Sequence, residues 1–264
     1  MAATYLDEIL AHHRARAEAD TRSWRDRVGV HYNGPSLLEA LANRMNDCVK
    51  LVAEVKRRSP SKGWLKESLD VGELVRDYAH GGATAISILT DTEHFAGASD
   101  DLTTASSAVT LPLLRKDFTV SENDVLDAAE MGASAVLLIV AALDDGQLAS
   151  FVTLAHDAGI DAVVEVHDDD EASRALDAGA RIIGINQRNL RTFDVDTDRA
   201  ASVIGSLPSS IITVCESGLR TSDDVARAAQ AGFDAVLVGE AFVTSDSVVD
   251  LVRAFSTVPL AHRD

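Results

Sequence analysis

Several short apolar segments of this sequence end in acidic, amine or amide side chains rather than in ordinary turn residues. These side chains are Glu54, Lys56, Lys116, Glu165, Asn186 and Glu216. A lysine that is removed from water can release a proton near neutral pH, and a carboxylate can accept one. The residue types therefore favour acid–base chemistry. The alternative is a structural network of ion pairs, but a network that served stability alone would not need to gather at one end of the segments.

The distribution of lysine supports a catalytic interpretation. The chain contains 5 lysines and 19 arginines, and three of the five lysines (Lys56, Lys62 and Lys116) follow apolar segments of this kind. Arginine does not release its proton near neutral pH, whereas a desolvated lysine can. We interpret the retained lysines as positions at which an amine is required.

Two glycine-containing turns indicate a phosphate site. Ser217-Gly218 and Gly239-Glu240 each follow an apolar segment, and each precedes a helical pattern. Glycine lets backbone N–H groups approach an anion, and the N-terminus of a helix favours negative charge. Either glycine alone would more often mark a plain turn, but the two together favour phosphate.

The elements that must position these residues alternate along the chain. Eight short runs are apolar on both faces, as a buried parallel sheet requires. They cover residues 49–55, 85–89, 111–114, 135–140, 162–166, 181–185, 211–214 and 235–238. Between them lie helical patterns, including those at 123–131, 144–158, 169–178 and 222–231.

One joint between helix and strand recurs five times, at 81–86, 132–136, 159–163, 179–183 and 232–236. In each, a glycine ends the helix, where a left-handed residue is needed, and a strand begins two residues later. Eight βα units predict a (β/α)8 (TIM) barrel over residues 49–264, whose chemistry lies at the C-terminal ends of the strands. An open doubly wound sheet is the alternative, but it usually has fewer strands, and no Gly-x-Gly-x-x-Gly follows the first strand.

Residues 1–48 precede the first strand and are predicted to form a helical extension. A charged helix is expected at 4–27, and a shorter one at 36–44 behind Pro35. The extension either caps the bottom of the barrel or folds over its mouth to help close the site.

The composition excludes some partners. The chain has 264 residues, of which 46% are apolar, and its 42 acidic and 24 basic side chains give a formal net charge of −18. This charge argues against nucleic acid or an anionic membrane as partner, since both need a basic face. It leaves room for a small anionic substrate in a positive pocket. An acidic chain with few lysines fits a high-salt cytoplasm, where screening removes most of the self-repulsion.

Cysteines and histidines give no sign of a metal site. Cys48 and Cys215 provide neither a disulfide framework nor a metal-ligand spacing, so we expect a reducing interior and no metal. The eight histidines are expected to form no tight cluster, with only His167 near the mouth of the barrel. The longest apolar run, residues 135–143, has nine residues, far fewer than a membrane span needs, and we expect no signal peptide.

The chain resembles the indole-3-glycerol-phosphate synthases in seven motifs. They are LVAEVKRRSPSKG (51–63), ISILTDTEHFAG (86–97), PLLRKDF (112–118), VVEVH (163–167), GINQRNL (184–190), ESGL (216–219) and VLVGEAF (236–242). The resemblance covers essentially the whole chain, and SPSKG together with LRKDF is specific to this family. It implies ring closure of 1-(2-carboxyphenylamino)-1-deoxyribulose 5-phosphate with loss of CO2 and water, a step of tryptophan biosynthesis. It implies no metal or organic cofactor, and a substrate that carries a carboxylate and a phosphate.

The resemblance also implies roles for individual residues. Lys116 matches the proton donor to the ribulose C2 oxygen, and Glu165 matches the carboxylate that serves the dehydration as base and acid. Lys56 matches a lysine beside the substrate carboxylate, which pairs with Glu54 when the site is empty. The groups that match contacts to the sugar hydroxyls, or that orient the lysines, are Asn186, Glu216 and Ser217.

Further residues match substrate-binding positions. The phosphate positions are Ser59, Gly218, Gly239 and Glu240. Arg188 matches a residue near an anionic end of the substrate, and the sequence does not decide which anion it meets. The apolar slot for the anthranilate ring is expected at Phe118, Leu137, Leu190 and Leu237, for which ordinary barrel core is an equal alternative. The chain departs from the common family pattern at Gln187, where asparagine is usual, and at Ala241, where a serine hydroxyl often stands.

Two other functions stay open at this stage. Phosphoribosylanthranilate isomerase, another phosphate-binding barrel enzyme, would need a cysteine base near the end of the first strand, where this chain has Glu54 and Lys56. A non-catalytic barrel scaffold would be expected to have lost at least one of Lys56, Lys116 and Glu165. We expect a cytoplasmic monomer, with other enzymes of the tryptophan pathway as candidate partners.

Overall fold

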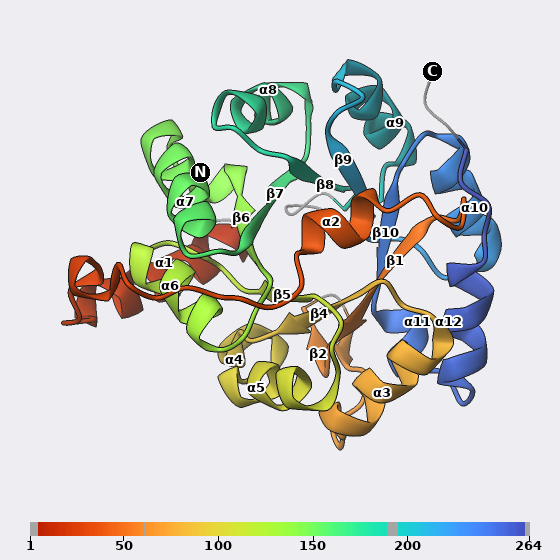
Figure 1. Cartoon of the computed structure of the whole chain (residues 1–264), viewed down its shortest axis with the longest axis horizontal. Coiled ribbons are helices and arrows are strands. Elements are labelled where there is room, and N and C mark those ends of the chain that lie inside the picture. Colours follow the sequence, from red (N-terminus) through yellow and green to blue (C-terminus); the bar gives the residue numbers. More distant parts are fainter. Residues whose placement is uncertain (1–4, 61, 189–194, 262–264) are drawn as a thin grey trace.

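The structure, a computed structural model, describes residues 5–60, 62–188 and 195–261 and shows a closed barrel (Figure 1). Eight parallel strands follow one another in the order β1-β10-β9-β8-β7-β6-β5-β4. They are β1 (Lys50–Val55), β4 (Ala85–Leu89), β5 (Leu113–Lys116), β6 (Ala135–Ile139), β7 (Asp161–Val166), β8 (Ile182–Asn186), β9 (Ile212–Glu216) and β10 (Ala235–Val238). The predicted (β/α)8 fold is confirmed. A two-stranded hairpin, β2 (Arg58–Ser59) with β3 (Gly63–Trp64), follows the first barrel strand.

Three strands extend further toward the mouth than predicted, including β8, which continues by one residue to Asn186. β5 was expected at 111–114 but begins after Pro112 and ends at Lys116, and β9 continues to Glu216. Proline lacks the N–H that a central strand donates to its neighbour, which explains the later start of β5. The prediction ended each strand at its last apolar residue. The strands in fact continue because these polar side chains are paired inside the barrel mouth.

An outer layer of helices covers the barrel. It comprises α3 (Val71–Gly81), α5 (Ser99–Ala108), α6 (Glu122–Glu130), α7 (Asp145–Asp157), α8 (Asp169–Asp177), α9 (Thr197–Ser206), α10 (Ser222–Gln230) and α12 (Val248–Ser256), with short turns α4 (Thr92–Phe95), η2 (Val140–Ala142) and α11 (Glu240–Val243). Aspartate side chains cap several of these helices, at Asp70, Asp144, Asp168 and Asp196. An aspartate at this position accepts hydrogen bonds from free backbone N–H groups. Its negative charge also interacts favourably with the positive N-terminal end of the helix dipole. Some of the aspartates therefore stabilise helix N-termini.

The five repeated joints have the predicted conformation. Gly82, Gly132, Gly159, Gly179 and Gly232 all have positive φ, between 74° and 96°. Each of them lies between the end of a helix and the start of the next strand, as a left-handed helix terminus requires.

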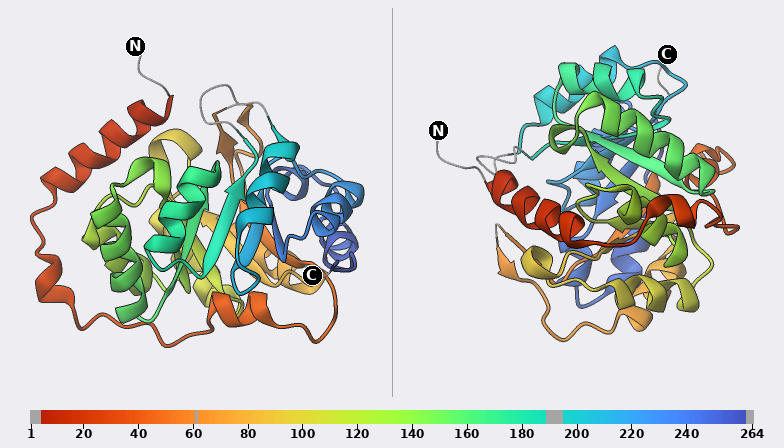
Figure 2. Two further views of the ribbon diagram at one scale, coloured as in Figure 1. Left: turned by 90° about the horizontal axis from the view of Figure 1, so that it is seen from above. Right: turned by 90° about the vertical axis from the view of Figure 1, so that its left-hand side faces the viewer.

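The N-terminal extension is divided between the two ends of the barrel (Figure 2). The helix predicted at 4–27 is interrupted: α1 (Tyr5–Ala19) is followed by a bend and a 3-10 turn, η1 (Trp24–Arg27). α2 (Leu37–Ala42) lies at the N-terminal end of the strands, where the Ser36 hydroxyl donates to Asp161 Oδ2 at 2.9 Å. α1 lies at the mouth. The extension therefore contacts both ends of the barrel, α2 at the bottom and α1 at the mouth. No helix within the described residues is long and apolar enough to cross a membrane.

Candidate active site

A pocket at the C-terminal end of the strands brings together the residues expected in the site. Among the residues lining it are Glu54, Lys56, Ser59, Lys116, Phe118, Leu137, Glu165, Asn186, Arg188, Glu216, Ser217, Gly218, Leu237, Gly239 and Glu240. Leu190, the remaining residue of that prediction, lies outside the described residues. Strands of a parallel barrel all end on one side, which explains how residues from distant segments meet here.

Lys116 lies between two buried carboxylates. Its Nζ is 3.1 Å from Glu165 Oε2 and 3.2 Å from Glu216 Oε2. The three residues come from β5, β7 and β9, and alternate strands of a barrel place their side chains in one interior layer. Pairing of this kind is what a buried ammonium requires.

The three groups have different proton affinities. Burial lowers the pKa of Lys116, but the neighbouring carboxylates raise it more, so its pKa lies above the ordinary value. Burial raises the pKa of Glu165, yet the charges of Lys116 and His167 leave its pKa below the ordinary value. For Glu216, burial and repulsion from Glu165 raise the pKa. Two carboxyl groups whose environments push their pKa values apart are suited to different acid and base roles. Glu165 is ionised, and Glu216 holds a proton more readily.

Glu54 and Lys56 form an ion pair at the end of β1, on the same face of the strand as predicted. Two glycines make room for the carboxylates of the site. A Cβ atom at Gly239 would lie 2.6 Å from Glu54 Oε1, and one at Gly184 would lie 2.2 Å from Glu216 Oε1. Gly239 therefore has a steric role beside the anion-binding role expected from the sequence.

Asn186 orients the Glu165 carboxylate. Its Nδ2 donates to Glu165 Oε1 at 3.1 Å, while its Oδ1 accepts from the Ser217 hydroxyl at 2.8 Å and from the Arg188 backbone N–H at 3.0 Å. Ser217 has a φ of 70°, a strained conformation for a residue other than glycine, and such strain is often stored at functional sites. The donors around Asn186 fix its amide so that the NH2 group faces Glu165.

Gln187, where the family usually has asparagine, has a structural role in this chain. Its Nε2 lies 2.6 Å from Cys215 Sγ and 3.3 Å from the backbone oxygen of Ser217. Burial raises the pKa of the Cys215 thiol to about 12, so this cysteine is a poor nucleophile.

The rim of the pocket carries basic side chains. Lys62 forms an ion pair with Glu240, and Arg220 Nη2 lies 3.8 Å from the same Glu240 oxygen. The Ser59 hydroxyl is buried and has no hydrogen-bond partner among the described residues. A buried polar group without a partner is uncommon, and it fits a position that a polar ligand completes.

Sequence reasoning missed several lining residues. Tyr5, Leu6 and Ile9 of α1 form part of the pocket wall, together with Phe95 of α4 and with Arg220. Arg220 follows the ESGL motif directly, and its charge could have identified it. The residues of α1 gave no comparable signal, because their contact with the pocket depends on where α1 packs.

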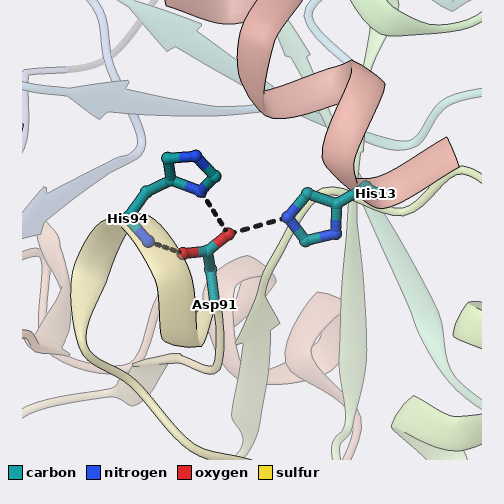
Figure 3. Close-up of side chains that lie close together, drawn as sticks. All are labelled: His13, Asp91 and His94. Carbon is teal, nitrogen blue, oxygen red and sulfur yellow. Dashed lines mark hydrogen bonds and ion pairs between the residues drawn. The ribbon is translucent and has the colours of Figure 1, made fainter. Parts of the chain in front are cut away.

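The expectation that the histidines form no tight cluster is wrong. His13 Nε2 lies 2.7 Å from Asp91 Oδ2, and His94 Nδ1 lies 3.1 Å from the same oxygen (Figure 3). His13 and Asp91 are 78 positions apart in the chain, so no spacing could reveal the contact. The ligand atoms of the three side chains lie within 4.8 Å of one another, close enough to hold a metal ion.

Hydrogen bonding already accounts for the geometry of this cluster. Asp91 Oδ1 accepts the backbone N–H groups of His94 and Phe95, and Oδ2 faces the two imidazoles. The His13 Nδ1 atom is buried without a partner among the described residues, whereas a metal-bound imidazole usually donates its second N–H to an acceptor. We interpret the cluster as a clasp that fastens α1 to the barrel.

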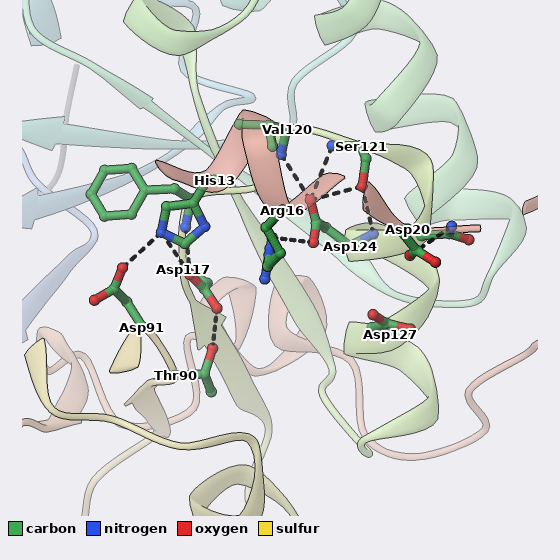
Figure 4. Close-up of polar contacts among 12 residues, drawn as sticks. His13, Arg16, Asp20, Thr90, Asp91, Asp117, Val120, Ser121, Asp124 and Asp127 are labelled. Carbon is green, nitrogen blue, oxygen red and sulfur yellow. Dashed lines mark hydrogen bonds and ion pairs between the residues drawn. The ribbon is translucent and has the colours of Figure 1, made fainter. Parts of the chain in front are cut away.

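Further ion pairs join the extension to α6, and Figure 4 shows the one between Arg16 and Asp124. Arg16 of α1 pairs with Asp124 of α6, and Arg22 and Arg27 both pair with Asp127 of the same helix. Asp124 also completes the capping box of its own helix: its Oδ2 accepts the Ser121 backbone N–H, and its own backbone N–H donates to the Ser121 hydroxyl. These contacts hold α1 where it completes the pocket.

Loss of the clasp should destabilise the protein. In His13→Ala, Asp91 stays buried but loses one of its partners, so we expect the free energy of unfolding to fall by about 1–3 kcal/mol. Chemical denaturation measures this change. His80→Ala, at an exposed position of α3, is the matched control and should leave the value unchanged. Equal stability of the two variants would contradict the clasp.

Fold and site together define a class: a barrel enzyme with a buried lysine–carboxylate centre for acid–base chemistry. The family model for indole-3-glycerol phosphate synthase matches residues 6–255. The chain belongs to the indole-3-glycerol phosphate synthase family.

Curated relatives agree with this family. A protein named indole-3-glycerol phosphate synthase from Beutenbergia cavernae is 49% identical over 215 residues, covering 80% of each chain. One from Mycolicibacterium vanbaalenii is 44% identical over 258 residues, covering 96% of this chain and 95% of the relative. Among solved structures, 3-hexulose-6-phosphate synthase superposes with a TM-score of 0.63 at 16% identity, over 80% of this chain and 100% of that one. At this low identity, the likeness shows the fold alone.

Proposed function

We propose that this protein converts 1-(2-carboxyphenylamino)-1-deoxyribulose 5-phosphate into indole-3-glycerol phosphate, CO2 and water, as a carbon–carbon lyase (carboxy-lyase) of tryptophan biosynthesis. One observation carries the proposal: in a chain of this family, Lys116 lies between Glu165 and Glu216 in a pocket that also contains the Glu54–Lys56 pair. The pocket thus offers a proton donor, an ionised base and a second cation, and the reaction needs all three.

Lys116 is the proposed acid for ring closure. The aromatic carbon attacks C2 of the ribulose chain, and negative charge develops on the C2 oxygen. The raised pKa of Lys116 keeps its ammonium protonated at neutral pH, so the donor is loaded before the substrate arrives. The developing alkoxide is a much stronger base than an amine, which makes the transfer favourable in the transition state.

Glu165 is the proposed base and acid of the dehydration. Its lowered pKa keeps it ionised, ready to take a proton, and the Asn186 amide fixes its orientation. The proton it takes can then be returned to the departing hydroxyl, which leaves as water. Glu216 shares Lys116 with Glu165 and supports the proton donor from the opposite side.

The remaining groups position the substrate. Lys56 would exchange its partner Glu54 for the substrate carboxylate and hold it until CO2 leaves. The phosphate is assigned to the backbone N–H groups near Gly218 and Gly239, with the Ser59 hydroxyl and the rim cations close by. The anthranilate ring is assigned to the apolar wall of Phe118, Leu137 and Leu237 together with the α1 residues. The proposed reaction needs no metal or organic cofactor.

The direct test is to add the carboxyphenylamino-deoxyribulose phosphate to the purified protein and to follow the rise of indole fluorescence. We expect turnover in buffer that contains a chelator. Absence of turnover with a folded protein would favour a non-catalytic scaffold, and conversion of phosphoribosylanthranilate instead would favour the isomerase.

We further propose that the protein works as a cytoplasmic monomer whose surface is adapted to high salt. The chain has 29 aspartates and 13 glutamates but only 24 lysines and arginines. The screening length is roughly 10 Å at 0.1 M salt and 3 Å at 1 M, so molar salt removes most of the self-repulsion.

The free energy of unfolding should therefore rise from low to molar KCl. Urea titrations at several KCl concentrations measure it. NaCl at equal ionic strength is the control and should act equally, because screening depends on ionic strength. A stability that is indifferent to salt would contradict the adaptation.

A further inference from the structure

The imidazole of His167 lies directly beside the proposed base. His167 follows β7 and is two residues beyond Glu165, so both side chains emerge at the mouth. Its Nε2 is 3.6 Å from Glu165 Oε1, and only 12% of its side chain is exposed. This nitrogen is buried and has no hydrogen-bond partner among the described residues. A small movement of either side chain would bring Nε2 within hydrogen-bond distance of the carboxylate.

Glu171 fixes the other side of the ring. Its Oε2 lies 3.0 Å from His167 Nδ1 and accepts the His167 backbone N–H at 2.8 Å. Glu171 is itself placed by the first turn of α8, where its backbone N–H donates to Asp168 Oδ1 at 2.9 Å. The contact with Glu171 makes Nδ1 the protonated nitrogen, since a carboxylate can only accept. A second proton on this ring would therefore lie on Nε2 and point toward Glu165.

The charges around the ring favour that second proton. The titratable groups facing it are Glu171 of α8, Glu165 of β7 and Glu216 of β9, and Lys116 of β5 lies beyond Glu165. Burial lowers the pKa of His167, but the hydrogen bond to Glu171 and the nearby carboxylate charges raise it more, so the pKa lies above its ordinary value. When His167 is protonated, Glu165 has two cationic neighbours, Lys116 at Oε2 and the imidazolium near Oε1.

We propose that His167, held by Glu171, is a positioning residue that keeps Glu165 ionised and oriented and thereby sets the pH range in which Glu165 acts as base. The inference rests on the proposed function, because it concerns how that reaction is tuned. His167 is not among the described residues that line the pocket, so we place it as a residue that acts through Glu165.

Two substitutions separate the charge of His167 from its hydrogen bond. In His167→Gln, the amide N–H can replace Nε2–H but carries no charge. Loss of a nearby positive charge raises the pKa of a carboxylate, so the acidic limb of the kcat–pH profile should move up by about one pH unit or more. The plateau should stay near the wild-type value. His167→Ala should show the same displacement together with a lower plateau. His156→Gln, at an exposed position of α7, is the matched control and should keep the wild-type profile.

A second measurement does not depend on turnover. The ring protons of His167 can be titrated by NMR in the wild-type protein, in Glu171→Gln and in Glu165→Gln. Both variants remove a carboxylate charge beside the ring, so the pKa of His167 should fall in each. This measurement also serves if the His167 variants fail to fold.

The outcomes are distinguishable. A wild-type protein that does not turn over the substrate overturns the proposed function. A working wild-type enzyme with an unmoved acidic limb in His167→Gln overturns the present inference, as does a His167 titration that is the same in wild type and in Glu165→Gln.

Discussion

Lys116→Met should abolish turnover while the affinity for substrate is largely kept. The methionine has a similar length but no proton to donate, and the donor acts mainly in the transition state, so kcat falls and KM changes little. Loss of a general acid typically lowers the rate by about 10²–10⁴-fold. Initial rates measured over a range of carboxyphenylamino-deoxyribulose phosphate concentrations give kcat and KM separately. A variant that retains more than about a tenth of the wild-type kcat would refute the assignment.

Two controls isolate proton donation from charge and folding. Lys116→Arg keeps a cation between Glu165 and Glu216 but holds its proton far more tightly, so it should be nearly as inactive as the methionine variant. Lys50→Met replaces a buried lysine at the start of β1, at the other end of the barrel, where Nζ donates to Asn46 Oδ1 at 2.8 Å. It should retain turnover.

The same variant should change how stability depends on pH. Without the ammonium, Glu165 and Glu216 are two buried carboxyl groups whose pKa values in the folded protein lie above those in the unfolded chain. The unfolded state then releases protons first as the pH rises. The free energy of unfolding of Lys116→Met should therefore fall, relative to wild type, as the pH rises from acid to neutral. Parallel pH dependence of the two proteins would show that Lys116 does not neutralise the pair.

Glu165→Gln should lower kcat by at least about 10²-fold, the usual effect of losing a general acid or base. Glutamine keeps the shape of the side chain and can still meet Asn186, but it cannot take up the proton that dehydration releases. KM should stay near the wild-type value, since Lys56 and the phosphate position are unchanged. Glu73→Gln, at an exposed position of α3, is the matched control and should be fully active. Full activity of Glu165→Gln would move the role of base to Glu216.

The predictions for Lys116 and Glu165 both combine sequence evidence with structural evidence. The sequence placed Lys116 and Glu165 at strand ends, and the family resemblance gave each a role. The structure adds the distances, 3.1 Å from Lys116 to Glu165 and 3.2 Å to Glu216, and with them the proton affinities of the three groups. Only these contacts say that the pKa of Glu165 is lowered by Lys116 and His167 while that of Glu216 is raised by burial.

Polar side chains at the ends of apolar runs indicated the site better than the net charge did. Acidic residues dominate the composition, yet Lys56, Lys62, Lys116, Arg188 and Arg220 gather around the pocket mouth. The pocket places individual cations beside carboxylates, as with Lys56 beside Glu54, so a net charge of −18 does not exclude an anionic substrate. The net charge governs how the protein interacts with salt and solvent, whereas the positions of a few lysines indicate which ligand the pocket binds.

The sequence by itself determined the barrel and most of its site, because the signals involved are local. Runs that are apolar on both faces, with a glycine such as Gly132 or Gly232 at each joint, specify repeated βα units. Closure of those units brings every strand end to one side, so Glu54, Lys116 and Glu216 had to meet. Strand limits were less well predicted, since a polar residue such as Lys116 looks like a turn until its partners are known.

Tertiary structure alone decided which side chains form ion pairs at the barrel mouth and which residues of α1 complete the pocket wall. The wall formed by Tyr5 and Ile9, and the clasp of His13 on Asp91, depend on how α1 packs against the barrel. Glu165, His167 and Glu171 are near neighbours in the sequence, yet only the backbone of the turn between β7 and α8 decides that their side chains meet. Sequence spacing does not record such contacts, because through-space distances of about 3 Å arise only when separate elements pack, and electrostatic interactions depend steeply on those distances.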